Sequence, residues 1–102
     1  MTIASAGKLD EFVARHPDAE GALAAWRQHA ITASWKSLQE VKQTFRAADG
    51  VTVDSGRTIT VFNIRGNNYR LLTAINYRTG VLIVHDLLTH AEYDKEKWKR
   101  TL

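Results

Sequence analysis

The segment Val61-Phe62-Asn63-Ile64-Arg65-Gly66-Asn67-Asn68-Tyr69-Arg70-Leu71 decides how this chain folds. Two runs of β-branched, aromatic and aliphatic residues flank Arg65-Gly66-Asn67-Asn68, and tight turns favour glycine and asparagine. The segment therefore predicts a β-hairpin whose turn carries arginine and asparagine side chains. Such a turn presents cations and amide donors that suit a bound phosphate.

Segments on both sides of this hairpin have the same β-forming composition, and short turns join them. Arg78-Thr79-Gly80 is a second candidate hairpin turn. Consecutive strands joined by short turns predict an antiparallel meander. The predicted strands are Val51–Val53, Thr58–Ile64, Tyr69–Tyr77 and Val81–Leu88.

The first half of the chain predicts three helices, each with a candidate capping residue at its start. Ser5 and Asp18 precede runs with apolar residues at helical spacing, and Ser37-Leu38-Gln39-Glu40 fits a capping box. These helices are expected to end near His16-Pro17, Thr32 and Phe45.

A second capping box, Thr89-His90-Ala91-Glu92, predicts a short C-terminal helix that includes Trp98. Helices that precede a contiguous meander are typical of an α+β fold rather than an alternating α/β fold. We therefore expect N-terminal helices packed on an antiparallel β-meander, followed by a short C-terminal helix.

Composition limits the class of protein. A length of 102 residues with 44% hydrophobic residues predicts one domain, residues 1–102, with a modest core. The absence of cysteine suits a reducing cytoplasm. The first residues lack the pattern of a signal peptide, and no apolar run reaches the roughly 20 residues of a membrane span. We expect a soluble cytoplasmic protein without a membrane partner.

The net charge of +3 comes from the second half of the chain. Residues 1–50 contain six basic and six acidic side chains, whereas residues 51–102 contain eight basic and five acidic ones. A stretch whose only charged side chains are arginines predicts an anion-binding surface, although it could equally be a solvated basic face without a partner. Between Ser55 and His85 the charged side chains are Arg57, Arg65, Arg70 and Arg78.

The alternation of side chains along a strand predicts which of these residues share a face. Arg70, Asn76 and Arg78 are expected on one face of their strand, where the planar guanidinium groups could hold phosphate oxygens. The alternative is that the arginines pair with carboxylates of the last strand and helix and only stabilise the edge. Those carboxylates are Asp86, Glu92 and Asp94.

His90 is the candidate for proton transfer. It falls in the first turn of the predicted C-terminal helix, and an imidazole exchanges protons near neutral pH. Tyr93 follows three residues later on the same helical face, so both side chains could reach one point. The alternative is a purely structural histidine in a capping turn. His16 and His29 are expected to be inert, and His85 is expected to face the core because it alternates with apolar neighbours.

Other chemistries find little support. The chain has no cysteine nucleophile and no glycine-rich phosphate loop, and its histidines do not have a metal-site spacing. We expect no cofactor and no metal. A nuclease built from these residues would use the 2′-hydroxyl of RNA as its nucleophile, which restricts it to RNA. The predicted catalytic residues are Arg70, Arg78, His90 and Tyr93, and the predicted RNA-binding residues are Arg65, Asn67, Asn68, Asn76 and Lys95.

Two motifs in this order and spacing are specific: Gly-Asn-x-Tyr-Arg-Leu at 66–71 and Thr-His-x-Glu-Tyr-Asp at 89–94. With these motifs the chain resembles the HigB-type toxins of bacterial toxin–antitoxin modules, which are small ribonucleases. The resemblance also covers His16–Glu20, Ala25-Trp26, Trp35–Ser37, Phe45–Asp49, Val61–Ile64 and Ile75–Tyr77.

The resemblance implies a RelE-like α+β fold and cleavage of messenger RNA, usually on the translating ribosome. It also implies neutralisation by a HigA-type helix-turn-helix antitoxin, with the toxin–antitoxin complex bound to its own promoter DNA. Two positions depart from the pattern of the family. Asn67 stands where a basic residue is common and His85 where arginine is expected, so the catalytic set can differ from that of its relatives.

Two functions remain open on sequence alone. The first is an endoribonuclease toxin (an mRNA interferase) in which arginine stabilises the phosphorane and His90 acts as general acid or base. The second is a non-catalytic basic module that occupies ribosomal RNA or an acidic protein and so blocks translation. Only detection of cleaved messenger RNA separates the two.

Overall fold

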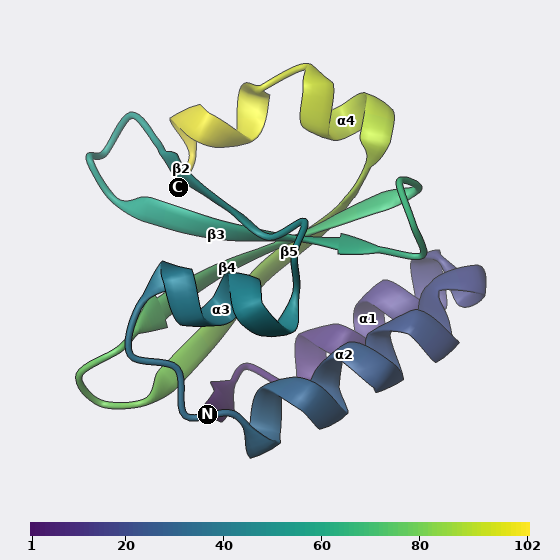
Figure 1. Cartoon of the computed structure of the whole chain (residues 1–102). Helices are drawn as coiled ribbons and strands as arrows, with labels where there is room; N and C mark the ends of the chain where they lie inside the picture. Colours follow the sequence, from purple (N-terminus) through teal and green to yellow (C-terminus); the bar gives the residue numbers. More distant parts are fainter.

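The computed structural model describes residues 1–102 and has three layers (Figure 1). Three helices lie on one face of a five-stranded sheet, and a short C-terminal helical segment lies on the other face. The elements are β1 (Thr2–Ala4), α1 (Gly7–Arg15), the 3₁₀ helix η1 (Pro17–Ala19), α2 (Glu20–Thr32), α3 (Leu38–Thr44), β2 (Asp49–Thr52), β3 (Thr58–Ile64), β4 (Tyr69–Asn76), β5 (Val81–Thr89), α4 (His90–Asp94) and the 3₁₀ helix η2 (Lys97–Arg100).

The sheet confirms the predicted meander and extends it by one strand. Its order is β1-β5-β4-β3-β2, and the four strands from β2 to β5 pair antiparallel with their sequence neighbours. β1 pairs in parallel with the first half of β5, through Ile3 opposite Leu82. The sequence did not predict β1, because three residues are too few to show a strand period.

The hairpin turn between β3 and β4 follows the sequence prediction. Ile64 pairs with Tyr69, which leaves Arg65-Gly66-Asn67-Asn68 as the turn. Arg65 and Gly66 both have positive φ, at 54° and 64°. This conformation suits glycine and is strained for most other residues, so Gly66 makes the turn possible at this length.

Two of the four predicted caps are correct. The Ser37 hydroxyl accepts a hydrogen bond from Glu40 N, and Thr89 forms a complete capping box with Glu92. The prediction for Ser5 was wrong, because Ser5 has a φ of 61° and α1 begins after Ala6. The prediction for Asp18 was also wrong, because Asp18 lies inside η1 and its carboxylate binds Tyr69 instead.

The two faces of the sheet bury two separate apolar clusters. The larger cluster packs α1, α2 and α3 on the sheet and includes Trp26, Phe62 and Leu71. The smaller cluster lies on the opposite face and has five buried members: Val53, Ile59, Val61, Leu72 and Trp98. Leu71 and Leu72 therefore face opposite ways, as the predicted alternation along β4 requires.

The C-terminal segment is not one helix, which corrects the prediction of a single helix that includes Trp98. α4 ends at Asp94, and Glu96 has a φ of 60°, which interrupts the helix. Trp98 then lies in η2, with its indole Nε1 donating to Tyr93 O at 3.0 Å. This break turns the chain so that Trp98 can enter the smaller cluster.

Candidate active site

Polar side chains meet where the β3–β4 turn approaches the start of α4. Thr89, the last residue of β5, pairs with Tyr69, the first residue of β4. The amide of His90 donates to Asn68 O at 3.0 Å, which attaches the first residue of α4 to the turn. These contacts bring the turn and the helix next to each other, as the predicted site requires.

Arg70 lies on the α4 face of β4, half-buried beneath Tyr93. Its guanidinium carbon is 5.7 Å from the centre of the Tyr93 ring, within range of a cation–π interaction. Its Nη1 atom donates to Asn67 O and to Tyr69 O, both at 3.1 Å. Its Nη2 atom forms no hydrogen bond or ion pair, so this nitrogen is available to an incoming acceptor.

Tyr93 is held between Arg70 and Trp98. The Tyr93 and Trp98 rings stack with centroids 5.2 Å apart and planes 18° apart. Burial, and to a lesser extent the negative charge of Asp49, raises the pKa of the Tyr93 phenol. Tyr93 therefore stays protonated at neutral pH and can serve as a hydrogen-bond donor or a stacking surface, but not as a base.

His90 is exposed at the start of α4 and has one acidic partner. Its Nδ1 atom lies 2.8 Å from a carboxylate oxygen of Asp94, one helical turn later. A carboxylate at Nδ1 favours the ring form in which Nδ1 carries the proton, so that Nε2 is left to accept one. The partnership with Asp94 was not predicted, although the spacing of four residues on a helix could have indicated it.

The asparagines of the turn complete the group. Asn63 Nδ2 is 3.5 Å from Asn67 Oδ1, so β3 and the turn are linked by a weak side-chain contact. Asn67 and Asn68 are both exposed, and Lys95 is exposed at the end of α4. These residues add exposed amide and ammonium donors on the turn and at the end of α4. We refer to Arg70, His90, Tyr93 and Asp94 as the α4 cluster.

Three predicted residues lie elsewhere. Arg78 is in the β4–β5 turn, eight residues from Arg70, which is about 26 Å at roughly 3.3 Å per strand residue. The Asn76 side chain stabilises that turn, because its oxygen accepts hydrogen bonds from Arg78 N and Thr79 N at 3.1 and 3.2 Å. Arg65 turns toward the other face and pairs with Asp18 at 3.1 Å.

The three carboxylates that could have paired with the arginines interact with other groups instead. Asp86 pairs with Arg15 of α1 at 3.1 Å, and Asp94 pairs with His90. Glu92 accepts from Thr89 N at 2.9 Å, and this backbone contact lowers the pKa of the Glu92 carboxyl. Arg70 and Arg78 therefore do not form the ion pairs that would make them purely structural.

A second polar group, which the sequence did not predict, lies behind the turn. Tyr69 donates its hydroxyl to Asp18 Oδ1 at 2.7 Å, and its ring is 4.8 Å from that of His16. His16 was expected to be inert, but here it packs against the residue that precedes Arg70. Because Asp18 also binds Arg65, it attaches both ends of the turn to η1.

The Asp18–Tyr69 contact predicts a pH-dependent stability. The Tyr69 hydroxyl holds the pKa of the Asp18 carboxyl below its usual value, with a further contribution from Arg65. A carboxyl whose pKa is lowered by folding stabilises the fold above its unfolded pKa, near 4, and this contribution is lost as pH falls through the folded pKa.

Replacing Asp18 with Asn should therefore lower the melting temperature at pH 7 but have a smaller effect at pH 3. Thermal unfolding of wild type and Asp18→Asn across this range measures the difference. A melting-temperature gap that is constant with pH would contradict this assignment. Glu20→Gln, which alters an exposed carboxylate of α2 that forms no ion pair, is the matched control.

His85 does not face the core, which corrects the expectation from alternation. The register of β4 with β5 shifts between Leu72 and Thr73, so that Leu72 lies opposite Asp86 and Thr73 opposite Val84. His85 is the extra residue of this β-bulge and is half-buried. A bulge reverses the alternation locally, and the sequence gives no signal for it.

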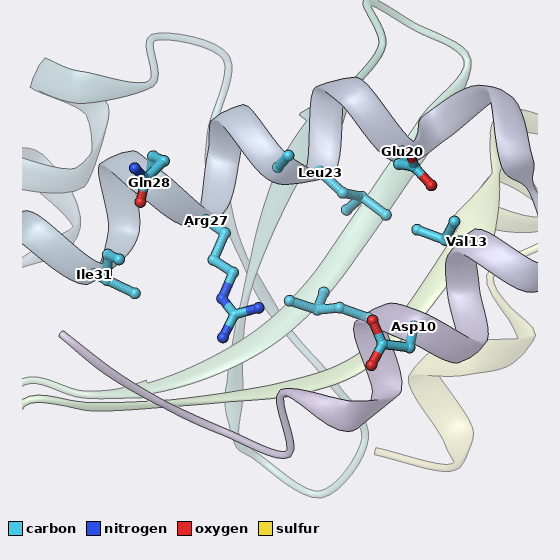
Figure 2. A pocket seen from close by; sticks show the side chains of 9 residues that line it. Asp10, Val13, Glu20, Leu23, Arg27, Gln28 and Ile31 are labelled. Atoms are coloured by element: carbon cyan, nitrogen blue, oxygen red, sulfur yellow. The ribbon is translucent and has the colours of Figure 1, made fainter.

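An apolar groove of about 570 Å³ lies between α1 and α2, on the face of the sheet opposite the α4 cluster. Figure 2 shows Asp10 on α1 and Arg27 on α2 extending into the space between the two helices, with Val13 and Leu23 beside them.

No three histidine, aspartate or glutamate side chains come together in a group that could hold a metal ion. None of the helices could span a membrane.

Three helices on one face of a meander, with a short C-terminal helix that carries the polar cluster on the other, define a RelE-like fold. The chain belongs to the HigB toxin family, the RelE-like toxic component of a toxin–antitoxin system, whose family model matches residues 19–96. A search of curated proteins gave no match. The protein is therefore a toxin, and its partner is an antitoxin.

Proposed function

We propose that this toxin is an endoribonuclease that cleaves messenger RNA, in the cytoplasm and in association with the ribosome. The observation that supports this proposal best is the α4 cluster. It consists of an imidazole, a guanidinium and a phenol near the junction of one turn and one helix. Exposed asparagine side chains of the turn add donors of a kind that contacts a nucleic-acid backbone.

The proposed reaction needs no metal. The 2′-hydroxyl of the RNA attacks the adjacent phosphorus, and the bond from phosphorus to the 5′-oxygen of the next nucleotide breaks. A base removes the proton of the 2′-hydroxyl, and an acid supplies a proton to the departing 5′-oxygen. The products are a 2′,3′-cyclic phosphate and a 5′-hydroxyl.

The residues of the α4 cluster have separate roles in this proposal. His90 Nε2 exchanges a proton with the RNA, while Asp94 holds the opposite side of the ring. Arg70 Nη2 stabilises the additional negative charge of the pentavalent phosphorane. Tyr93 orients the RNA, together with Asn67, Asn68 and Lys95. Arg78 and Asn76 lie too far from Arg70 to contact the same phosphate.

One observation favours the alternative of a non-catalytic binding module. Arg70 already donates to two carbonyl oxygens and lies against Tyr93, so part of its binding capacity stabilises the turn. In that case the basic surface would block translation by occupying ribosomal RNA. The availability of Nη2 and the His90–Asp94 pair support the catalytic proposal more directly.

Mapping of messenger RNA ends after brief induction of the toxin tests the proposal. Cleavage should produce new 5′ ends with a 5′-hydroxyl at discrete positions within translated regions. Growth arrest without new ends would support the binding module instead. Because we also propose a HigA-type helix-turn-helix antitoxin whose complex binds promoter DNA, co-expression of such a partner should remove the new ends. A promoter fragment should then be retarded by the complex.

A further inference from the structure

A second group of basic side chains lies on the same face of the sheet as the α4 cluster. Val84 and Leu87 of β5 point into the larger core, so the two residues between them, His85 and Asp86, point to the opposite face. Bulges commonly re-aim a side chain next to a functional site. His85 follows Val84 by plain alternation and shares the face of Ile83, and the bulge places Asp86 on that face as well.

Arg57, in the loop before β3, meets His85 on this face. The Arg57 Nη2 atom is 3.5 Å from His85 Nε2, although both groups are basic. Arg57 forms no ion pair, and Lys8 of α1 adds a third basic group by donating to His85 O at 3.4 Å. Two basic groups in contact without a carboxylate repel one another whenever both are charged, and an anion relieves this repulsion.

The carboxylates of the surrounding elements interact with other residues and not with Arg57 or His85. Asp86, next to His85, binds Arg15 and its own strand. Asp54, in the same loop as Arg57, interacts electrostatically with Lys99. Burial, followed by the positive charges of Arg57 and Lys8, lowers the pKa of the His85 imidazole. His85 is thus predominantly neutral at pH 7 and gains a proton more readily when an anion is nearby.

A groove of about 660 Å³ runs beside this pair at the β4–β5 end of the sheet. Arg57 forms one wall, and Ala74 and Ile83, which face each other across the two strands, form part of the floor. Ile83 is 38% exposed, which is unusual for a large aliphatic side chain in this protein. No carboxylate lines the groove. An apolar floor with a cationic wall suits a nucleotide, which combines a flat base with a phosphate.

We propose that Arg57 and His85 bind a backbone phosphate of single-stranded RNA, at a subsite separate from the α4 cluster. One phosphate oxygen can accept from Arg57 Nη2 while another accepts from protonated His85 Nε2, with the adjacent nucleotide over Ala74 and Ile83. This inference rests on the proposed function, because it takes RNA as the ligand. It adds that the strand continues along β4 toward the β4–β5 hairpin.

Binding of a 2′-O-methyl oligoribonucleotide tests the subsite without cleavage, since the nucleophile is blocked. Arg57→Gln and His85→Ala should each weaken binding roughly tenfold at low salt, and Arg57→Gln should reduce the dependence of affinity on salt by about one phosphate contact. Arg27→Gln is the matched control, because it removes an arginine from α2 on the opposite face. Its affinity and salt dependence should equal those of the wild type.

Nuclear magnetic resonance of the His85 ring supplies a second readout. Addition of the oligonucleotide near pH 6.5 should shift the His85 resonances toward those of the protonated ring in the wild type, and not in Arg57→Gln. Equal binding by the wild type and Arg57→Gln would overturn the subsite while leaving the proposed cleavage intact. An absence of RNA binding by the wild type would overturn both proposals. Equal competition by polyglutamate would show that the pair binds acidic protein and not phosphate.

Discussion

Replacing His90 with glutamine is expected to slow cleavage of messenger RNA on programmed ribosomes by roughly 100- to 10,000-fold, the range for removal of a general acid or base. Glutamine has a similar size and retains hydrogen-bonding groups, but it cannot exchange a proton near neutral pH. The capping box is made by Thr89 and Glu92 and should survive the change. Single-turnover cleavage is the measurement.

The controls separate chemistry from structure. His90→Gln should bind ribosomes as the wild type does and should melt at a similar temperature, because its side chain is exposed and its only side-chain ion pair is the one to Asp94. His29→Gln, which alters an exposed histidine of α2, should cleave normally. Cleavage by His90→Gln within a few-fold of wild type from pH 5.5 to 8.5 would remove His90 from the mechanism.

Replacing Arg70 with alanine should reduce cleavage by about 100-fold or more, because one charge-assisted donor to the developing oxyanion is lost. Lysine should restore only part of the activity, since it cannot donate to the turn carbonyls and to a phosphate oxygen in one planar arrangement. Arg78→Ala is the matched control. Its position in the distant β4–β5 turn predicts a much smaller loss of cleavage than that of Arg70→Ala.

Thermal unfolding distinguishes this role from a structural one. Loss of the Arg70 bonds to Asn67 O and Tyr69 O should lower the free energy of unfolding by about 1 kcal/mol. A purified Arg70→Ala variant that is mostly unfolded at the assay temperature would show that the lost toxicity reflects stability. A folded variant with wild-type cleavage would contradict the proposed role.

The strands could be predicted because their side chains alternate with a period of two and their turns contain glycine. β3 and the hairpin turn at Gly66 follow the prediction residue by residue. β1 could not be predicted, because its pairing with β5 depends on a tertiary contact across almost eighty residues. The bulge at His85 could not be predicted either, because a bulge changes the register of two strands without changing their composition.

Side-chain partners were harder to predict than elements. Asp18 has the spacing of a helix cap, but the Tyr69 hydroxyl, 51 residues later, binds it instead. Arg70, Asn76 and Arg78 alternate correctly, yet strand length separates Arg78 from Arg70. Sequence alternation identifies a shared face and says nothing of distance along it. His90 and Tyr93 lie on one short helix, as their spacing predicted.

The division of the apolar residues into two clusters has a consequence for how the toxin loses its site. The segment from His90 to Leu102 packs on the sheet through Trp98 and Tyr93 at the smaller apolar cluster, whereas most of the fold depends on the larger one. Burial of one large side chain contributes only about 1.5–3 kcal/mol. The segment from His90 to Leu102 can therefore open as a local unit while the sheet and α1–α3 remain folded. If His90 and Tyr93 act in cleavage as we propose, the fraction of active molecules is then set by this local equilibrium.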